Sequence, residues 1–184
     1  MNRNNHVLHA TMTALLLALA VMIPMVFPKI VIPPASYTLA SHVPIVIAMF
    51  ISPPAAVAVS VGAAIGFFIA GFPLPIVLRA ASHLLFATLG AVWLDRKSVP
   101  LSGKRLVLFS IVLSLIHVVC EIFVLLPLYF GGQMAQNVYE SGFFYFLILL
   151  IGGGGFIHSM IDFAIAAAIW KPLSKTPVIR KLKG

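Results

Sequence analysis

The sequence predicts an all-α, polytopic membrane protein with six transmembrane helices and both termini in the cytoplasm. Hydrophobic residues make up 61% of the 184 positions, and only 12 Lys or Arg and 4 Asp or Glu interrupt them. A bilayer-spanning helix needs about 20 apolar residues, so six spans account for most of the chain. The basic residues gather between alternate apolar stretches, as they do in cytoplasmic loops. We therefore expect a single transmembrane domain over residues 1–184.

The first apolar stretch, residues 7–27, contains no charge and is long enough to cross a bilayer. It is predicted to be a retained span rather than a cleaved secretory signal. Prolines in the segment 28–34 end this helix and favour an extended outer loop. A helix over 37–51, short for a full crossing, and a longer one over 55–72 follow, separated by a Ser-Pro-Pro sequence.

The second half of the chain predicts three longer helices. The fourth covers 76–94 and begins after a turn that contains prolines. A basic loop separates it from the fifth, over 106–130. The sixth, over 143–170, follows a polar loop that has no Lys or Arg, and a basic tail ends the chain.

The basic residues decide whether the short second helix counts as a crossing. Five spans would put the termini on opposite faces of the membrane, whereas six put them on the same face. With six spans, ten of the 12 Lys and Arg face the cytoplasm, Lys29 lies in an outer loop and Arg79 lies within the membrane. The ten are Arg3, Arg96, Lys97, Lys104, Arg105, Lys171, Lys175, Arg180, Lys181 and Lys183. This distribution explains the net charge of +8 without nucleic acid as a partner.

Three charged residues at predicted membrane depth each have a histidine one helical turn away. Side chains at i and i+4 share a helix face, so each pair forms a polar stripe. The pairs are Arg79 with His83, His117 with Glu121, and His158 with Asp162. Charges inside a membrane are costly unless they pair or face water, and they usually mark function. We expect the stripes to converge on a pocket that opens to the outside.

Two other interpretations of these pairs remain open. The six residues can simply satisfy one another, with Asp162 as a buried acceptor that joins two helices and His117 as an interhelical donor. Histidines and carboxylates at this spacing can also ligate zinc or nickel, but His117 and Glu121 lack the His-Glu-x-x-His arrangement. No metal and no other cofactor is predicted.

Small residues four apart mark helix faces that can approach a neighbour closely. The third and first predicted helices carry such series: Ala58, Gly62, Gly66 and Ala70, and Ala10, Ala14 and Ala18. The series on the third helix is expected to pack within the same bundle, whereas the one on the first helix can equally receive a partner protein. The glycine run 152–155 indicates close packing or a bend near the pocket.

The chain lacks the motifs of a self-sufficient pump or enzyme. It contains no Walker A pattern, no Gly-x-Ser-x-Gly elbow and no two-half inverted repeat. It is therefore predicted not to be an enzyme. Six short helices can hold a ligand, but the energy for uphill movement would have to come from another protein.

The predicted size and topology, together with the Ala-x-x-x-Ala face of Ala10, Ala14 and Ala18, resemble the substrate-binding S components of energy-coupling factor transporters. The resemblance covers the full chain. It implies a subunit of a bacterial plasma membrane that captures a vitamin or metal on the outer face. It also implies that the subunit topples against a transmembrane T component driven by two cytoplasmic ATPases. By resemblance, Ala14 and Ala18 form the docking surface, with Ala10 beside them.

The segment 33–44, PPASYTLASHVP, is similar to the group of S components assigned to niacin. The carboxylate of nicotinate suits a guanidinium, and its flat ring suits an aromatic or histidine face. Glu121 is also a candidate partner for the ring nitrogen. The expected substrate-binding residues are Arg79, His83, Glu121, His158, Tyr37, His42, Tyr139 and Tyr145.

Several alternatives stay open at this point. Pairing of Arg79 with Glu121 would suit a neutral ligand, so S components for hydroxymethylpyrimidine, pyridoxine or pantothenate share the predicted features. The nickel and cobalt branch is disfavoured because His6 and His9 do not match its N-terminal metal motif. A small structural scaffold protein and a metal-dependent intramembrane enzyme are alternatives from other classes.

Overall fold

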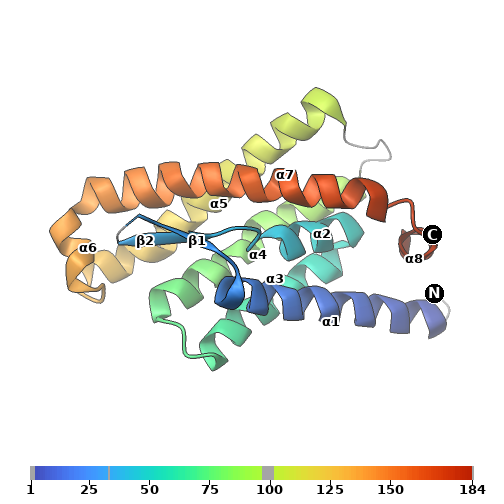
Figure 1. Cartoon of the computed structure of the whole chain (residues 1–184), viewed down its shortest axis with the longest axis horizontal. Helices are drawn as coiled ribbons and strands as arrows, with labels where there is room; N and C mark the ends of the chain where they lie inside the picture. The colour runs from blue at the N-terminus through green and yellow to red at the C-terminus, as the bar shows by residue number, and fades with distance from the viewer. Residues whose placement is uncertain (1–2, 33, 97–101, 184) are drawn as a thin grey trace.

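The computed structural model describes residues 3–32, 34–96 and 102–183, and it confirms an all-α protein, here with one small β-hairpin (Figure 1). Among the basic residues counted above, Lys97 lies outside the described residues. The elements are α1 Arg3–Val26, β1 Lys29–Ile32, β2 Ala35–Thr38, α2 Val43–Ile51, α3 Pro53–Ile69, α4 Leu74–Asp95, α5 Gly103–Phe130, α6 Gln136–Ser141, the π-helix η1 Phe144–Gly154, α7 Gly155–Leu173 and α8 Pro177–Lys183.

Within the described residues, four helical stretches are long and apolar enough to cross a membrane. They are Asn5–Val26, Leu74–Asp95, Gly103–Phe130 and Phe144–Leu173. Helix α3 is apolar but shorter. Only 17% of the most apolar window of the first stretch is buried, and Leu15 and Met22 are 56% and 54% exposed. An apolar outer surface of this kind faces lipid, because soluble proteins rarely expose so much of it. The chain is a multi-pass membrane protein.

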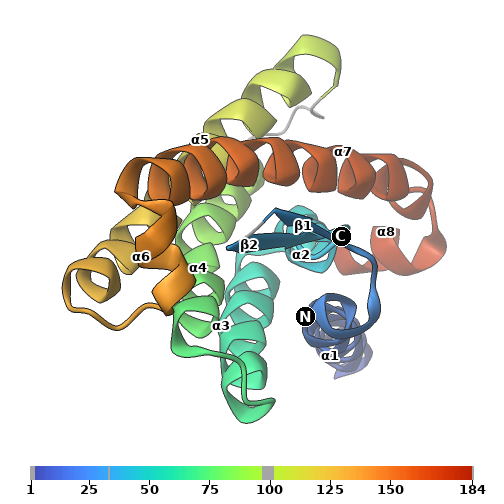
Figure 2. The same cartoon turned by 60° about the vertical axis from the view of Figure 1, so that its left-hand side comes forward.

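Helix α2 lies at the centre of the bundle (Figure 2). Every residue from Val43 to Ile51 is buried, and Ala48 is fully so. Helices α1, α3, α4 and α7 all pack against it. A helix that is apolar on every face is stable only where protein surrounds it. Pro44 lies in its first turn, where the missing N–H removes no helical hydrogen bond.

The predicted helix 37–51 is corrected to Val43–Ile51. Residues Ala35–Thr38 instead form β2, which runs antiparallel to β1 with Lys29 opposite Thr38. The turn that follows holds Ala40 at φ 65°, a left-handed conformation that a helix cannot contain. The other five predicted helices lie close to their observed bounds, and the last of them comprises η1 and α7.

Helices α1 and α3 approach each other closely through glycines of α3. A Cβ at Gly62 would lie 2.6 Å from the side chain of Leu17, and a Cβ at Gly66 would overlap Val21. Larger residues at these positions would push α1 away from the bundle. The two glycines of the small-residue series therefore pack within the bundle, as expected, whereas Ala58 and Ala70 are exposed.

The two termini lie at the same end of the bundle, and the hairpin extends toward the other end (Figure 1). The Nε2 atom of His9 on α1 donates a hydrogen bond to the carbonyl oxygen of Leu182 on α8, over 3.0 Å. Ile179 and Leu182 of α8 are 1% and 7% exposed. The short basic C-terminal helix is therefore anchored to the bundle by its apolar residues.

Candidate functional site

A cavity of about 130 Å³ lies beneath the β-hairpin, between α1, α3, α4, α5 and α7. This volume fits a few water molecules or one small solute. Lys29 and Ser36 of the hairpin line it and are exposed, so they mark its mouth. Its wall combines apolar side chains, such as Phe67, with the ionisable groups discussed above. A mostly apolar cavity with a few converging polar groups is the usual form of a small-molecule site.

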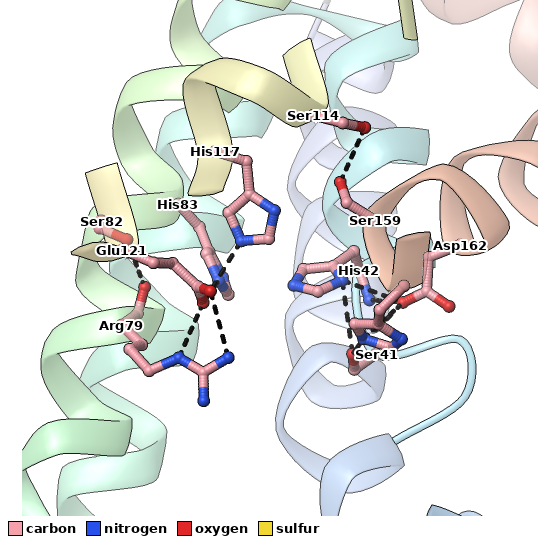
Figure 3. A network of polar contacts seen from close by, with 11 residues as sticks. Ser41, His42, Arg79, Ser82, His83, Ser114, His117, Glu121, Ser159 and Asp162 are labelled. Atoms are coloured by element: carbon pink, nitrogen blue, oxygen red, sulfur yellow. Dashed lines mark hydrogen bonds and ion pairs between the residues drawn. The ribbon is translucent and has the colours of Figure 1, made fainter. Parts of the chain in front are cut away.

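One wall of the cavity carries a paired arginine and glutamate (Figure 3). Arg79 of α4 donates from Nε to Oε1 of Glu121 over 3.0 Å and from Nη2 to Oε2 over 3.1 Å. The Glu121 side chain is 2% exposed and the Arg79 side chain 22%. A two-pronged ion pair compensates the buried carboxylate, which would otherwise be too costly to bury. The pairing uses two of the five guanidinium N–H groups and leaves three for another partner.

Two histidines lie beside this ion pair, each with a ring nitrogen within ion-pair distance of Glu121 (Figure 3). Nε2 of His83 is 3.6 Å and Nε2 of His117 is 3.4 Å from Oε1 of Glu121. Nε2 of His83 and both ring nitrogens of His117 are buried. None of the three has a neighbour with hydrogen-bond geometry among the described residues. Buried polar atoms are rarely left in this state, so each one requires an explanation.

The opposite wall is organised by Asp162 of α7 (Figure 3), whose carboxylate is fully buried. Its Oδ1 accepts the backbone N–H of Ala40 over 2.7 Å, and its Oδ2 accepts the backbone N–H of His42 over 2.9 Å. Oδ2 also accepts the Nδ1–H of His42 over 3.0 Å and the Ser41 hydroxyl over 3.3 Å. Asp162 therefore holds the turn before α2 and directs the His42 ring into the cavity.

The two walls meet through the ring of His42. Its centroid lies 4.8 Å from that of His83, 4.7 Å from that of His117 and 4.9 Å from that of His158. Ser41 lies 3.1 Å from Nε2 of His158, which links the turn to α7 a second time. The three polar stripes therefore converge, as the i and i+4 spacing predicted.

Tyr37 of β2 lines the cavity from the hairpin side. Its hydroxyl donates to the carbonyl oxygen of Leu150 in η1 over 2.7 Å, and the residue is 6% exposed. Gly154 admits this ring, because a Cβ there would overlap the Tyr37 hydroxyl. The glycine run thus provides the close packing that its composition suggested.

Replacing Gly154 with alanine should displace Tyr37 and weaken ligand binding by about tenfold, the expected cost of losing one buried hydrogen bond. Gly153→Ala is the matched control, because a Cβ there meets only the Ile148 carbonyl oxygen at 3.9 Å. Ligand affinity of the two purified variants, measured by calorimetry, checks the prediction. Equal affinities would mean that the Tyr37 position does not matter for binding.

Six of the eight predicted site residues line this one cavity, and two do not. The six are Tyr37, His42, Arg79, His83, Glu121 and His158. The Tyr139 hydroxyl instead accepts the backbone N–H of Met134 and donates to the Tyr129 carbonyl oxygen, so it braces its own loop. Tyr145 is 40% exposed and lies away from the lining.

Several lining residues did not follow from the sequence. Lys29, Ser36, Thr38 and Ser41 all contribute from the hairpin and its turn. The hydroxyl-rich run around Tyr37 and His42 was the available signal for the serines and the threonine. The apolar residues that α1 and α3 contribute to the cavity lining could not be identified from the sequence, because apolar residues on any packed helix face follow the same pattern.

The alanine series on α1 lies on the outer surface. Ala10, Ala14 and Ala18 are all exposed, and nothing in the described part of the chain covers them. The opposite side of the same helix carries Leu17 and Val21, which pack against α3. The smooth face of α1 therefore points away from the bundle.

Comparison with known proteins shows a clear relative. The chain is 39% identical over 165 residues to the niacin transporter NiaX of Lactococcus lactis subsp. cremoris (strain MG1363). The match covers 88% of this chain and 72% of the relative. No protein-family model matches the chain, and no solved structure matches it.

Proposed function

Because the chain belongs to the S-component family of energy-coupling factor vitamin transporters, as its relationship to NiaX shows, we propose that it is the high-affinity capture subunit of an importer for niacin. The single observation that carries the choice of ligand is the cavity with the Arg79 and Glu121 pair in its wall, in a chain 39% identical to a niacin transporter. The family relationship supports transport of a vitamin. The polar groups of the cavity wall support niacin as that vitamin.

Nicotinate, the anionic form of niacin, is a small flat pyridine ring that bears one carboxylate. The guanidinium of Arg79 keeps three N–H groups beyond those bound by Glu121, so it can hold the carboxylate while the ion pair stays intact. The rings of Tyr37, His42 and His158 offer faces and edges for the pyridine. Glu121 orients the guanidinium, which makes it a positioning residue in this arrangement.

We propose six membrane crossings with both termini in the cytoplasm. The adjacent termini and the basic ends of α1 and α8 support this topology (Figure 1). Helix α2 is about 14 Å long and strand β2 about 13 Å, so together they approach the bilayer thickness of about 30 Å. Non-helical backbone at membrane depth is tolerated where protein satisfies it, and Asp162 satisfies the amides of Ala40 and His42.

Transport needs energy from outside this chain, and we propose a T component with two cytoplasmic ATPases as its source. The exposed face of Ala10, Ala14 and Ala18 supports this, because small residues on a lipid-facing helix allow another helix to approach closely. In this arrangement the subunit binds niacin at the hairpin end and docks through α1.

Replacing Ala14 with tryptophan should abolish niacin uptake by cells while the purified protein binds niacin normally. A bulky apolar residue blocks the close helix approach but stays compatible with lipid. Ala168→Trp is the matched control, because Ala168 is an exposed alanine on α7. Uptake of labelled niacin and pull-down of the T component measure the effect. Normal uptake by the Ala14 variant would place the docking surface elsewhere.

The function itself is tested by asking which small molecule the purified protein retains and binds. Native mass spectrometry should show bound niacin, and calorimetry should rank nicotinate above nicotinamide, pyridoxine, hydroxymethylpyrimidine and pantothenate. Equal affinity for nicotinate and nicotinamide would exclude the carboxylate anchor at Arg79. Tight binding of a different vitamin would reassign the substrate, and binding of none would favour a structural scaffold.

A further inference from the structure

We propose that His42, His83 and His117 form a binding site for a divalent transition-metal ion at the inner end of the cavity, with one coordination position open to the ligand. The three residues come from the turn before α2, from α4 and from α5. One ring nitrogen of each lies within 4.8 Å of the others, and all three residues are buried. Figure 3 shows His42 reaching across from the Asp162 side toward His83 and His117.

The unpartnered nitrogens are the first reason for this proposal. Among the described residues, Nδ1 of His117, which is 1% exposed, has no hydrogen-bond partner, and Nε2 of His83 and of His117 lie 3.6 and 3.4 Å from Oε1 of Glu121 without hydrogen-bond geometry. A neutral imidazole carries one lone pair, which needs either a donor or a metal when water is excluded. His117 also lies behind the cavity lining, where a ligand in the cavity does not reach it.

The surroundings of His42 are those of a metal-binding histidine. Asp162 accepts its Nδ1–H over 3.0 Å, so the lone pair of Nε2 is available on the other side of the ring. Metal-bound histidines commonly donate their second nitrogen to a carboxylate in this way, which fixes the ring and strengthens the ligand. Four-coordinate zinc needs its nitrogens about 3.4 Å apart, so ligand atoms that lie within 4.8 Å of one another must approach by at most about 1.4 Å.

Charge is the third reason. With the buried histidines neutral, the groups of the two walls are Arg79, Glu121 and Asp162, which together carry one negative charge. A monoanionic ligand would raise this to two negative charges in a site shielded by lipid, an unfavourable arrangement. A divalent cation at the three histidines makes the site neutral once the anion binds. Lys29 lies at the exposed mouth, where solvent screens its charge.

No sequence pattern indicates this trio, because His42 and His117 lie 75 positions apart and the three histidines share no local spacing. Imidazole nitrogens suit zinc, nickel, copper and iron, so zinc is a suitable probe. Three protein ligands leave the fourth tetrahedral position free. The pyridine nitrogen of nicotinate, whose carboxylate Arg79 holds, can fill it, a part of the inference that rests on the proposed function.

The experiment uses full-length protein purified with a tag that contains no histidine and stripped with a chelator. Calorimetry with zinc should show one ion per chain, and cobalt should give the intense visible absorption of a four-coordinate site. His117→Gln should lose at least tenfold in zinc affinity, and His83→Gln provides the same test if the first variant does not fold. His9→Gln is the matched control, because His9 lies at the other end of the bundle.

His158→Gln distinguishes the proposed trio from a second set, His42, His158 and Asp162, whose ligand atoms also lie within 4.8 Å of one another. The His158→Gln variant should bind zinc as tightly as the unaltered protein. Absence of zinc binding in the unaltered protein, or its loss in the His158 variant with retention in the His117 variant, would overturn the proposal.

Nicotinate affinity is then compared between stripped and zinc-loaded protein, with at least a tenfold increase expected on loading. Unchanged nicotinate affinity would show that the bound metal does not contact nicotinate. Zinc binding without nicotinate binding would refute the proposed substrate and leave the metal site standing, whereas nicotinate binding without zinc binding would do the opposite.

Discussion

Asp162→Ala should destabilise the protein by about 3 to 5 kcal/mol, the range for removing one partner of a buried, hydrogen-bonded charge network. The carboxylate accepts four hydrogen bonds, and two of their donors are backbone amides, of Ala40 and His42. Without it these amides stay buried and unpaired, and the contact between Ser41 and His158 is left to tie the turn before α2 to α7. Thermal unfolding in detergent measures the loss.

Two matched variants show whether the effect comes from the hydrogen bonds. Asp162→Asn keeps one acceptor oxygen for the amides and should lose about half as much stability. Asp95→Ala removes an exposed carboxylate and should change stability by less than about 0.5 kcal/mol. An alanine variant as stable as the unaltered protein would mean that water replaces the carboxylate in the turn.

Arg79→Ala should weaken nicotinate binding by about 30- to 150-fold, since a charge-assisted hydrogen-bonded contact contributes about 2 to 3 kcal/mol. Nicotinamide, which has no carboxylate, should lose less. The substitution also leaves Glu121 buried without its partner, so stability should fall as well. Calorimetry with both compounds measures the difference between them.

A second variant separates loss of folding from loss of binding. Replacing both Arg79 and Glu121 with methionine removes both charges at similar volume, and such replacements of buried ion pairs are often neutral for stability. This double variant should fold and still fail to bind nicotinate. Retained binding in the double variant would show that the pair only stabilises the bundle.

The long helices could be predicted because each is a continuous apolar stretch with local end signals. Residues 103–130 contain only His117 and Glu121 as deep ionisable groups, and proline or glycine lies near both ends. The second helix was predicted too long because Tyr37 to Ile51 carries no Lys, Arg, Asp or Glu and is mostly apolar, so composition cannot distinguish one helix from a strand, a turn and a shorter helix. The deciding contact comes from Asp162, 122 residues after Ala40.

The candidate site could be predicted in part for the same reason. Charges within apolar helices stand out by their cost, so Arg79, Glu121 and Asp162 were found directly. The pairing of Arg79 with Glu121 and the position of His42 depend on how separate helices rotate, which no local pattern encodes. Tyr139 was placed in the site because it is aromatic and near a loop, but it braces that loop instead.

The dependence of the hairpin turn on Asp162 also sets an order for biogenesis. A ribosome must add 122 residues after Ala40 before the acceptor for that amide exists. Until then the Ala40 and His42 amides lack the acceptor that they have in the folded chain. We therefore expect a chain truncated before α7 to be unable to fix the turn before α2, even though three of the four long apolar helices have already been made.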